Sequence, residues 1–485
     1  MHRPANMNET LLERIARDAM IAHGLEPDFN AAARAQTGGL RQPSPDGCRD
    51  LRQLPWSSID NDESRDLDQL EVCVEEDGRT RVLIAIADVD VLVPEASPLD
   101  QHAGQNTTSV YTPAVVFPML PPQLSTDLTS LNPNEDRLAI VVDMTIEDGC
   151  SIHHSDIYRA IVRNKAKLAY NALAAWLDGQ GPAPSALTSD RQLADQVRLQ
   201  DRIAARLRDC REAEGALEFA RTELKPIVDG DAVKDLRAET PNRAKSVIEN
   251  FMVAANGVTA GFLRDRGYPS IRRVVKSPER WSRIVELASQ HGGSLPDSAD
   301  AHALQAFLRG QRTAQPDTFQ DLSLAIIKLL GRGEYVAESA QEPSAHFALA
   351  TGNYTHSTAP NRRYPDLVTQ RLLKAAIEGR PTPYALPELR HIAEHCTKQE
   401  DAANKVERVA SKAAAALWLT PRIGDVFNGI VTGAGPKGTW VRLVPTPVEG
   451  RVERGAEGMD VGDRVRVRLI GTDPRRGFID FARAS

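Results

Sequence analysis

The chain has 485 residues, of which 41% are hydrophobic and 26% charged, and its formal net charge is −7 at pH 7. This composition excludes a low-complexity or disordered chain and fits a globular protein of roughly two to four domains. The negative charge argues against a simple nucleic-acid coat, which is normally basic. A narrow basic channel can still bind phosphates on a protein that is acidic overall.

Cysteine usage and hydropathy predict a soluble, cytoplasmic protein. The five cysteines are scattered and form no C-x-x-C pair, which argues against a disulfide framework or a zinc ribbon and fits a reducing compartment. They are Cys48, Cys73, Cys150, Cys210 and Cys396. The N-terminus has no apolar run of the signal-peptide kind. The most apolar stretch, residues 82–93, contains Asp88 and Asp90 and is too short to span a bilayer, so we expect no membrane association.

The first part of the chain changes from a helical to a strand-like pattern. Apolar residues recur at helical spacing over 8–36, and Gly, Pro and Ser mark a linker over 37–48. Strands are predicted at 70–76, 80–93, 137–146 and 156–163. The first two flank Asp77-Gly78 and predict a hairpin, and the last two are expected to pair.

From about residue 166 the pattern becomes helical and then changes again near the C-terminus. Helices are predicted over 190–213, 241–264, 280–311, 318–331 and 363–420. Short alternating strands with glycine at the turns follow from Pro421 and predict a five-stranded barrel of the OB kind. Phe427, Trp440 and Phe478 lie among arginines there, which suits single-stranded RNA, although the aromatic side chains can instead fill the barrel.

Four aspartates gather just before a predicted strand, in residues 57–72. They are Asp60, Asp62, Asp66 and Asp68. Asp66 and Asp68 are two apart, so on an extended chain they share one face, and Asp60 can reach the same point across the loop. Hard oxygen ligands without Cys or His favour Mg²⁺ or Mn²⁺, and two such ions can drive phosphodiester displacement. Taken alone, the segment reads as a solvated acidic loop.

Two further segments have a functional and a structural interpretation. Arg362 and Arg363 follow Pro360 and precede a helix, and guanidinium groups near a helix N-terminus suit a phosphate. The structural alternative is a capped helix with surface arginines. Residues 107–125 are rich in proline and apolar side chains and include Tyr111. Core packing is the default there, and a ring that stacks on a base is the functional alternative.

Together and in this order, these segments resemble the ribonuclease II / ribonuclease R (RNB) family of processive exoribonucleases. The resemblance covers roughly residues 49–420 and the C-terminal barrel. Similar motifs lie at 59–68 (an I-D-x5-D-x-D run), 86–88 (I-A-D), 111–121 (Y-x-P…P-M-L-P), 131–137, 164–170 and 358–367. The resemblance implies an α+β fold, with a mixed sheet surrounded by helices and followed by an OB-fold barrel.

The resemblance also implies roles for particular residues. Asp60, Asp66 and Asp68 match the metal-binding aspartates, with Asp68 also catalytic. Arg362 matches the arginine that steadies the scissile phosphate, with Arg363 beside it. The residues expected to contact the terminal nucleotide of RNA are Tyr111 and Phe219, which stack on bases, and Tyr170 and Glu249, which read the ribose.

The chain departs from the family pattern at two places. The fourth family aspartate is Gln69 here, which offers one neutral oxygen and should weaken one metal site unless Asp62 replaces it. The family normally carries two cold-shock OB domains before the catalytic domain, whereas only about 48 residues precede it here. Substrate affinity and strand selectivity are therefore expected to differ.

The sequence thus predicts a helical segment and linker (1–48), an RNB catalytic domain (49–420) and an S1-like OB domain (421–485). The expected activity is Mg²⁺-dependent (Mn²⁺ is also suitable), processive 3′→5′ hydrolysis of single-stranded RNA to nucleoside 5′-monophosphates. The expected protein is a cytoplasmic monomer that binds RNA 3′ ends. The rivals are an RNA-binding protein of the same fold with an attenuated site, favoured by Gln69, and an unrelated two-metal phosphodiesterase.

Overall fold

A seven-stranded mixed sheet forms the centre of the larger part of the chain, with the strand order β1-β8-β7-β4-β3-β2-β9. The computed structural model describes residues 9–76, 78–147, 151–220, 223–230, 232–239, 241–339 and 346–484. The sheet strands are β1 Arg49–Asp50, β2 Ser57–Asp60, β3 Gln69–Glu76, β4 Arg79–Ala87, β7 Asp136–Ile146, β8 Ile152–Arg163 and β9 Ala166–Ala169. Strands β3, β4 and β7 are buried along most of their length, as expected for a sheet covered on both faces.

The predicted hairpin and the predicted strand pair are confirmed. Strand β3 pairs antiparallel with β4, and β7 pairs antiparallel with β8; Asp77, in the expected turn, lies outside the described residues. Strand β4 ends at Ala87, so the prediction that it extends to residue 93 is wrong. The backbone N–H groups of Val89 and Asp90 donate instead to the side-chain oxygen of Gln370, at 2.9 and 3.0 Å.

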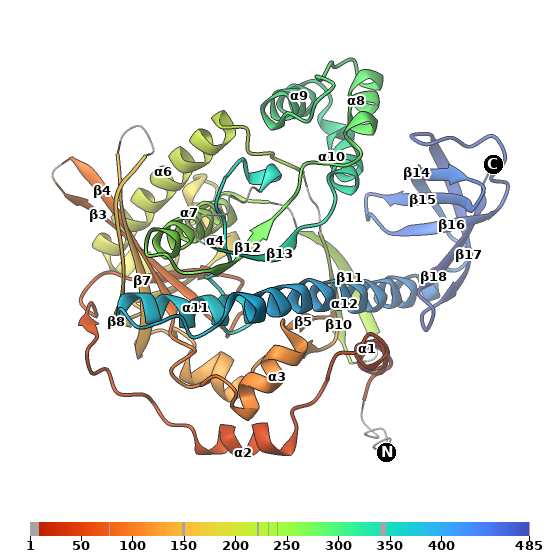
Figure 1. Cartoon of the computed structure of the whole chain (residues 1–485). Coiled ribbons are helices and arrows are strands. Elements are labelled where there is room, and N and C mark those ends of the chain that lie inside the picture. The colour runs from red at the N-terminus through yellow and green to blue at the C-terminus, as the bar shows by residue number, and fades with distance from the viewer. Residues whose placement is uncertain are drawn as a thin grey trace.

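Some helices of this part of the chain pack against the sheet, whereas those of residues 281–330 form a cluster of their own (Figure 1). The bounds of all these helices are α3 Pro98–Asn106, α4 Tyr170–Leu177, α5 Ser185–Ser189, α6 Arg191–Ala213, α7 Arg243–Asp265, α8 Trp281–Gln290, α9 Ala301–Ala314, α10 Pro316–Leu330 and α11 Tyr364–Ile377. The predictions at 190–213, 241–264 and 318–331 are confirmed within a few residues. Asp190 and Asn242 start α6 and α7 by accepting from the third backbone N–H of each helix.

Three predicted helices are each divided in two by local chain breakers. Residues 8–36 form α1 (Leu11–Ala22) and α2 (Ala31–Gly39), because Gly24 adopts a φ of +77° and Pro27 follows it. Residues 280–311 form α8 and α9, with Pro296 in the connection. Residues 363–420 form α11 and α12 (Leu386–Leu419), because Gly379 at φ +63° ends the first.

Short strand pairs that the sequence pattern did not reveal lie around the sheet. They are β5 Val110–Tyr111 with β6 Val116–Phe117, β10 Glu223–Asp229 with β11 Ala232–Glu239, and β12 Ser270–Val274 with β13 Glu334–Glu338. Strands β12 and β13 are 60 residues apart in sequence, so no local signal marks their pairing. Their polar and charged residues also obscure the alternation that identifies a strand.

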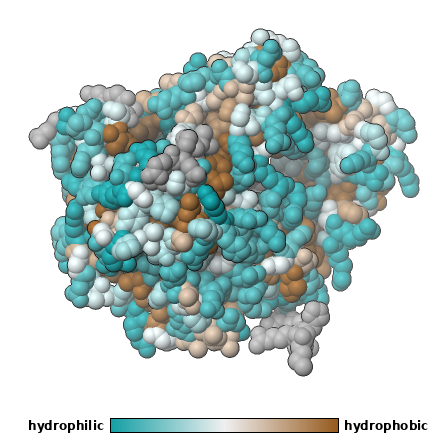
Figure 2. Space-filling model, viewed as in Figure 1, coloured by the Kyte–Doolittle hydropathy of each residue, from teal (hydrophilic) through white to brown (hydrophobic). Residues whose placement is uncertain are grey.

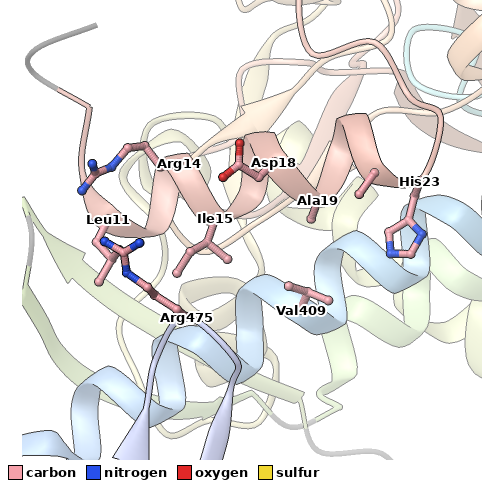
Figure 3. A pocket seen from close by; sticks show the side chains of 9 residues that line it. Leu11, Arg14, Ile15, Asp18, Ala19, His23, Val409 and Arg475 are labelled. Carbon is pink, nitrogen blue, oxygen red and sulfur yellow. The ribbon is translucent and has the colours of Figure 1, made fainter. Parts of the chain in front are cut away.

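Helix α12 links the RNB-like part of the chain to the C-terminal barrel. Helix α1 packs along it, with Ile15 and Ala19 facing Val409 and with Arg475 of the barrel nearby (Figure 3). The barrel is closed and five-stranded, as predicted: β14 Val426–Gly435, β15 Gly438–Val444, β16 Glu449–Arg454, β17 Arg464–Asp473 and β18 Phe478–Arg483.

Different aromatic side chains lie in the core of the barrel and on its surface. Phe481 is fully buried inside the barrel, and Phe427 packs partly against that core. Phe478 is 47% exposed, with the guanidinium carbon of Arg476 4.4 Å from the centre of its ring. Phe478 is therefore available to a ligand, whereas Phe427 partly fills the barrel.

The visible surface is mostly hydrophilic, with small separate hydrophobic areas (Figure 2). No helix among the described residues is long and apolar enough to cross a membrane. Cys48, Cys73 and Cys396 have free thiols, whereas Cys210 is disulfide-bonded.

Candidate active site

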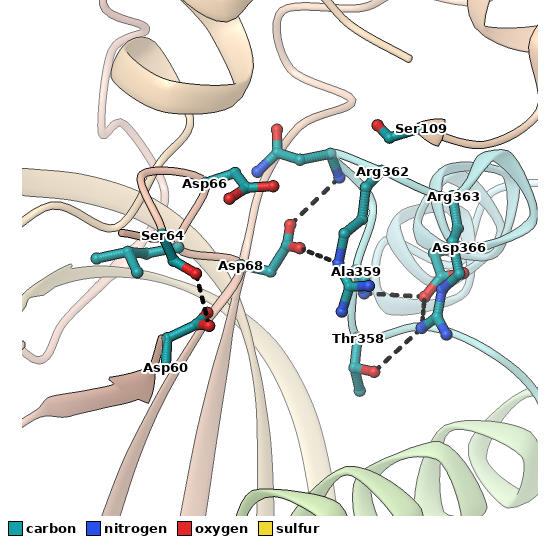
Figure 4. A network of polar contacts seen from close by, with 12 residues as sticks. Asp60, Ser64, Asp66, Asp68, Ser109, Thr358, Ala359, Arg362, Arg363 and Asp366 are labelled. Carbon is teal, nitrogen blue, oxygen red and sulfur yellow. Dashed lines mark hydrogen bonds and ion pairs between the residues drawn. The ribbon is translucent and has the colours of Figure 1, made fainter. Parts of the chain in front are cut away.

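The centre of the site is a contact between Asp68, immediately before β3, and Arg362, in the loop before α11. The Nε of Arg362 donates to Oδ2 of Asp68 at 3.1 Å, and the backbone N–H of Asn361 donates to Oδ1 at 3.3 Å (Figure 4). Asp68 is 2% exposed, while the Arg362 side chain is 44% exposed. The carboxylate is therefore fixed inside the protein, and the guanidinium extends from it toward solvent.

Burial governs the protonation of Asp68. Desolvation raises its pKa to about 6, the Arg362 charge opposes this shift, and the Asp66 carboxylate adds to it. The influence of Asp66 shows that two predicted metal-ligating carboxylates lie close enough to repel each other. A cation between them would relieve this repulsion.

Tyr111 joins this cluster from the β5–β6 hairpin. Its hydroxyl donates to Oδ2 of Asp66 at 3.1 Å, and its backbone N–H donates to Oε1 of Glu407, on α12, at 2.9 Å. The residue is 43% exposed, so its ring remains accessible. Desolvation, followed by the charge of Asp66, raises the pKa of Tyr111, which keeps its hydroxyl protonated.

Asp60 is held in its own loop. Its Oδ1 accepts from the Ser64 hydroxyl at 2.8 Å and from the Asn61 backbone N–H at 2.7 Å. The same loop is fixed by the Lys167 ammonium, which donates to the carbonyls of Asp62 and Ser64 at 2.9 and 2.6 Å. Figure 4 shows Asp60 apart from the adjacent Asp66 and Asp68.

The donor set fits a divalent cation only in part. Within the described ranges, no group of three His, Cys, Asp or Glu side chains is arranged to hold a metal ion. Asp66 and Asp68 nevertheless fit one, because both are hard oxygen donors and their repulsion calls for a positive charge. Both hydrogen bonds to Asp60 are accepted by Oδ1, and its carboxylate lies apart from the other two, so Asp60 would have to move toward them to become a third ligand. Gln69, the first residue of β3, is 7% exposed and offers a neutral amide in place of a carboxylate.

Arg363 has a different environment from Arg362. Its Nη2 donates to Oδ1 of Asp366 at 2.7 Å and lies 3.4 Å from the Thr358 hydroxyl. Asp366 also accepts from the Ala359 backbone N–H at 2.9 Å, so this ion pair fixes the loop that presents Arg362 (Figure 4). The geometry gives Arg363 a positioning role, and its predicted contact with RNA stays a prediction.

The remaining predicted residues lie at or near a large cavity of about 1130 Å³. Phe219 and Glu249 line it, together with Lys245 at the start of α7. Tyr170 stands between this cavity and the aspartates: the Lys245 ammonium lies 5.9 Å from the centre of its ring, and the Asp60 charge acts on its hydroxyl. Tyr111 is not among the lining residues, and the prediction that both rings stack on bases stays a prediction.

Two family models match this chain, one for each of its two main parts. The RNB domain model matches residues 48–379, and the RNase II-type exonuclease C-terminal S1 domain model matches residues 425–484. The chain belongs to the RNB family. Its mixed sheet with surrounding helices and its closed barrel agree with this assignment.

Relatives of this RNB chain include ribonuclease R of Aquifex aeolicus, which is 29% identical over 463 residues and covers 89% of the chain and 64% of the relative. Ribonuclease R of Escherichia coli is 28% identical, covering 96% of the chain and 61% of the relative. The chain therefore spans less than two thirds of the length of these relatives. Mycoplasma genitalium RNase R in complex with ribose-methylated single-stranded RNA has the same fold, with a TM-score of 0.88, 22% identity and coverage of 98% of this chain and 78% of that chain.

Two residues of this RNB site escaped sequence analysis. Glu407 holds the Tyr111 hairpin, but it is one of many charged residues in a long helix and has no local motif. Ser64 holds Asp60, yet a single serine in an acidic loop carries no signal by itself. The first contact joins residues 296 positions apart, and the second closes a local turn between residues four positions apart, which no motif marks.

Proposed function

We propose that this RNB protein hydrolyses single-stranded RNA from the 3′ end and releases nucleoside 5′-monophosphates one at a time. The observation that supports this most strongly is the buried Asp68 carboxylate bonded to the partly exposed Arg362 guanidinium, beside Asp66. Relatives that bear the name ribonuclease R support the same reaction. A large cavity next to Tyr170 suits a chain end, because it can enclose a terminal nucleotide.

The carboxylates are proposed to hold Mg²⁺, or Mn²⁺ in its place. Asp66 and Asp68 would hold the ion, with Asp60 as a third ligand and the Gln69 oxygen as a neutral fourth. When bound, such an ion supplies Lewis-acid polarisation of the phosphate and lowers the pKa of water. Asp68 meets the requirement for an ionised ligand above about pH 6, where its carboxyl group has lost its proton.

Arg362 stabilises the charge that develops on the phosphate. Its Nε is used by Asp68, which fixes the plane of the guanidinium and leaves its outer N–H groups for phosphate oxygens. A donor fixed before the reaction loses little free energy by reorganisation when charge develops. The Asp366–Arg363 pair holds the loop in this position.

Aromatic side chains are proposed to position the strand. The exposed ring of Tyr111 stacks on a base near the scissile bond, and Phe219 stacks on a base inside the cavity. Glu249 in the cavity wall and Tyr170 beside Lys245 meet the ribose. Phe478 and Arg476, on the barrel surface, hold the incoming strand. These contacts place the terminal phosphate against Asp68 and Arg362. Holding the reacting groups in this geometry lowers the entropic part of the barrier to hydrolysis.

The test is degradation of uniformly labelled single-stranded RNA with Mg²⁺, with end-group analysis of the products. We expect mononucleotides, loss of activity in EDTA, and loss of activity in Asp68→Asn but not in the surface control Asp265→Asn. Tight RNA binding without turnover at any Mg²⁺ or Mn²⁺ concentration would instead identify an RNA-binding protein with an attenuated site. Internal fragments would identify an endonuclease.

A further inference from the structure

Arg211, near the end of α6, is a half-buried cation that lines the large cavity together with Phe219, Glu249 and Asn250. One of its terminal nitrogens donates to the side-chain oxygen of Asn250. The amide nitrogen of Asn250 donates to the Ser246 carbonyl at 2.7 Å, which fixes the direction of its oxygen. The Arg211 guanidinium is therefore held in one orientation at the cavity wall.

The other cations of the cavity wall each have a carboxylate partner. These pairs are Arg208–Glu212, Arg243–Asp201, Lys245–Glu239, Arg273–Glu400 and Arg312–Glu218. Arg211 makes no ion pair with any residue of the described ranges, and its Nε is buried without a hydrogen-bond partner there. The Glu249 carboxylate is near enough to favour the charged form of Arg211, but it does not form an ion pair with the guanidinium.

A buried cation without a counter-charge destabilises a protein unless a ligand supplies that charge. Desolvation lowers the pKa of Arg211, although a guanidinium remains charged at neutral pH. Its planar N–H groups match phosphate oxygens better than they match any neutral group. The cavity volume of about 1130 Å³ is sufficient for a nucleotide, and the Phe219 ring is present to contact a base.

We propose that Arg211 binds the phosphomonoester group of a nucleotide in this cavity. The choice of a nucleotide rests on the proposed function, whereas the anion site rests on the cavity and on the unpaired guanidinium. Two sources supply this chemistry: the 5′-phosphate of a released nucleotide, and a 3′-phosphate at the end of a bound RNA.

The experiment is equilibrium dialysis of the full chain in EDTA, so that RNA hydrolysis plays no part in the measurement. The probes are adenosine, adenosine 5′-monophosphate and adenosine 3′-monophosphate. The variants are Arg211→Gln and the control Arg191→Gln, on the same helix, where the arginine side chain is 95% exposed.

We expect at least one monophosphate to bind about tenfold or more tightly than adenosine to the native chain and to Arg191→Gln, and this preference to disappear in Arg211→Gln. The preferred isomer identifies the source of the phosphate. Equal binding of adenosine and both monophosphates, or a preference that survives in Arg211→Gln, would overturn the proposal.

Thermal unfolding without ligand separates an anion site from a structural arginine. Arg211→Gln should leave the midpoint unchanged or raise it, because an unpaired buried charge is removed. Arg371→Gln should lower it strongly, because Arg371 is buried with Asp90 and Asp100 as partners at 2.9 and 2.8 Å. A decrease in Arg211→Gln as large as that in Arg371→Gln would also overturn the proposal. Failure of RNA hydrolysis in the separate degradation assay would overturn the proposed function alone.

Discussion

The Nε of Arg362 lies 3.1 Å from Oδ2 of Asp68, although 294 positions of sequence separate the two residues. The contact joins the start of β3 to the loop before α11. Neither residue has its functional environment in an isolated segment, so the site forms only when the sheet and α11 are in place. Its two members should therefore be sensitive to different substitutions.

Substitution of Arg362 should lower kcat more than it changes KM. Arg362→Gln removes the positive charge that meets the phosphate, and we expect kcat to fall by about 10²–10³-fold, as for loss of one transition-state donor. Arg362→Lys should recover only part of this loss, because an ammonium cannot bond Asp68 and the phosphate in one plane. Single-turnover hydrolysis of labelled RNA measures the effect. An unchanged kcat in Arg362→Gln would remove this residue from the mechanism.

Tyr111→Phe separates the ring of this residue from its hydroxyl. The ring remains for stacking, while Asp66 loses the hydrogen bond that the hydroxyl donates at 3.1 Å. Because that donor competes with a cation for Asp66, the Mg²⁺ concentration for half-maximal activity should fall, by less than about tenfold for one hydrogen bond. Tyr111→Ala should in addition weaken RNA binding, and an Mg²⁺ titration of both variants tests the two effects. A higher Mg²⁺ requirement in Tyr111→Phe would contradict this account of the hydroxyl.

Gln69→Asp places a fourth carboxylate at the start of β3. Without metal, the new charge lies in a position that is only 7% exposed, so the unfolding temperature in EDTA should fall. Added Mg²⁺ should restore it, and the Mg²⁺ needed for half-maximal activity should fall by about tenfold, since a carboxylate binds the ion better than an amide. Gln69→Glu keeps the length of the native side chain, so comparison of the two variants separates the effect of charge from that of reach. If Mg²⁺ stabilises the native chain and Gln69→Asp equally, position 69 is not a ligand.

Stability should fall as the pH decreases from about 6.5 toward 4. Burial lowers the pKa of His346 to about 4, and burial together with Arg363 and Arg273 lowers the pKa of His356 well below its usual value. In this range the unfolded chain takes up protons that the folded chain does not, so the stabilisation is complete above the unfolded pKa and decreases below it. Urea unfolding at several pH values should show a flatter profile for His356→Gln than for the exposed control His391→Gln. Parallel profiles would contradict this assignment.

The sequence predicted the strands and helices in which apolar residues recur at a regular spacing. The hairpin of β3 and β4, the pair of β7 and β8, and the five-stranded barrel are confirmed. Helix ends were predicted less well, because Gly24 and Gly379 stop a helix at one residue while the apolar period continues past them. Strands β12 and β13 were missed, since their stability comes from a partner that lies far away in sequence.

The candidate site was predicted in its chemistry and only partly in its geometry. The structure brings Asp66, Asp68, Tyr111 and Arg362 together, as the motif order indicated. It leaves Asp60 with Ser64 and directs Arg363 to Asp366, because each makes short polar contacts that the motif does not encode. Residue types thus indicated which groups belong to the site, while competing partners decide where each group points.

Helix α12 sets a fixed distance between the Tyr111 hairpin and the C-terminal barrel. Glu407 accepts a hydrogen bond from the Tyr111 hairpin, and Leu419 is buried in the barrel core, so twelve residues of uninterrupted helix, or about 18 Å, separate the hairpin from the barrel. Since the hairpin and the barrel are both proposed to bind RNA, we expect a strand too short to reach both to be released whatever its sequence. Insertion of seven residues into α12, about two turns, would keep the helix faces in phase and increase the distance between the hairpin and the barrel by about 10 Å. The shortest RNA left undegraded should then become longer by a fixed number of nucleotides.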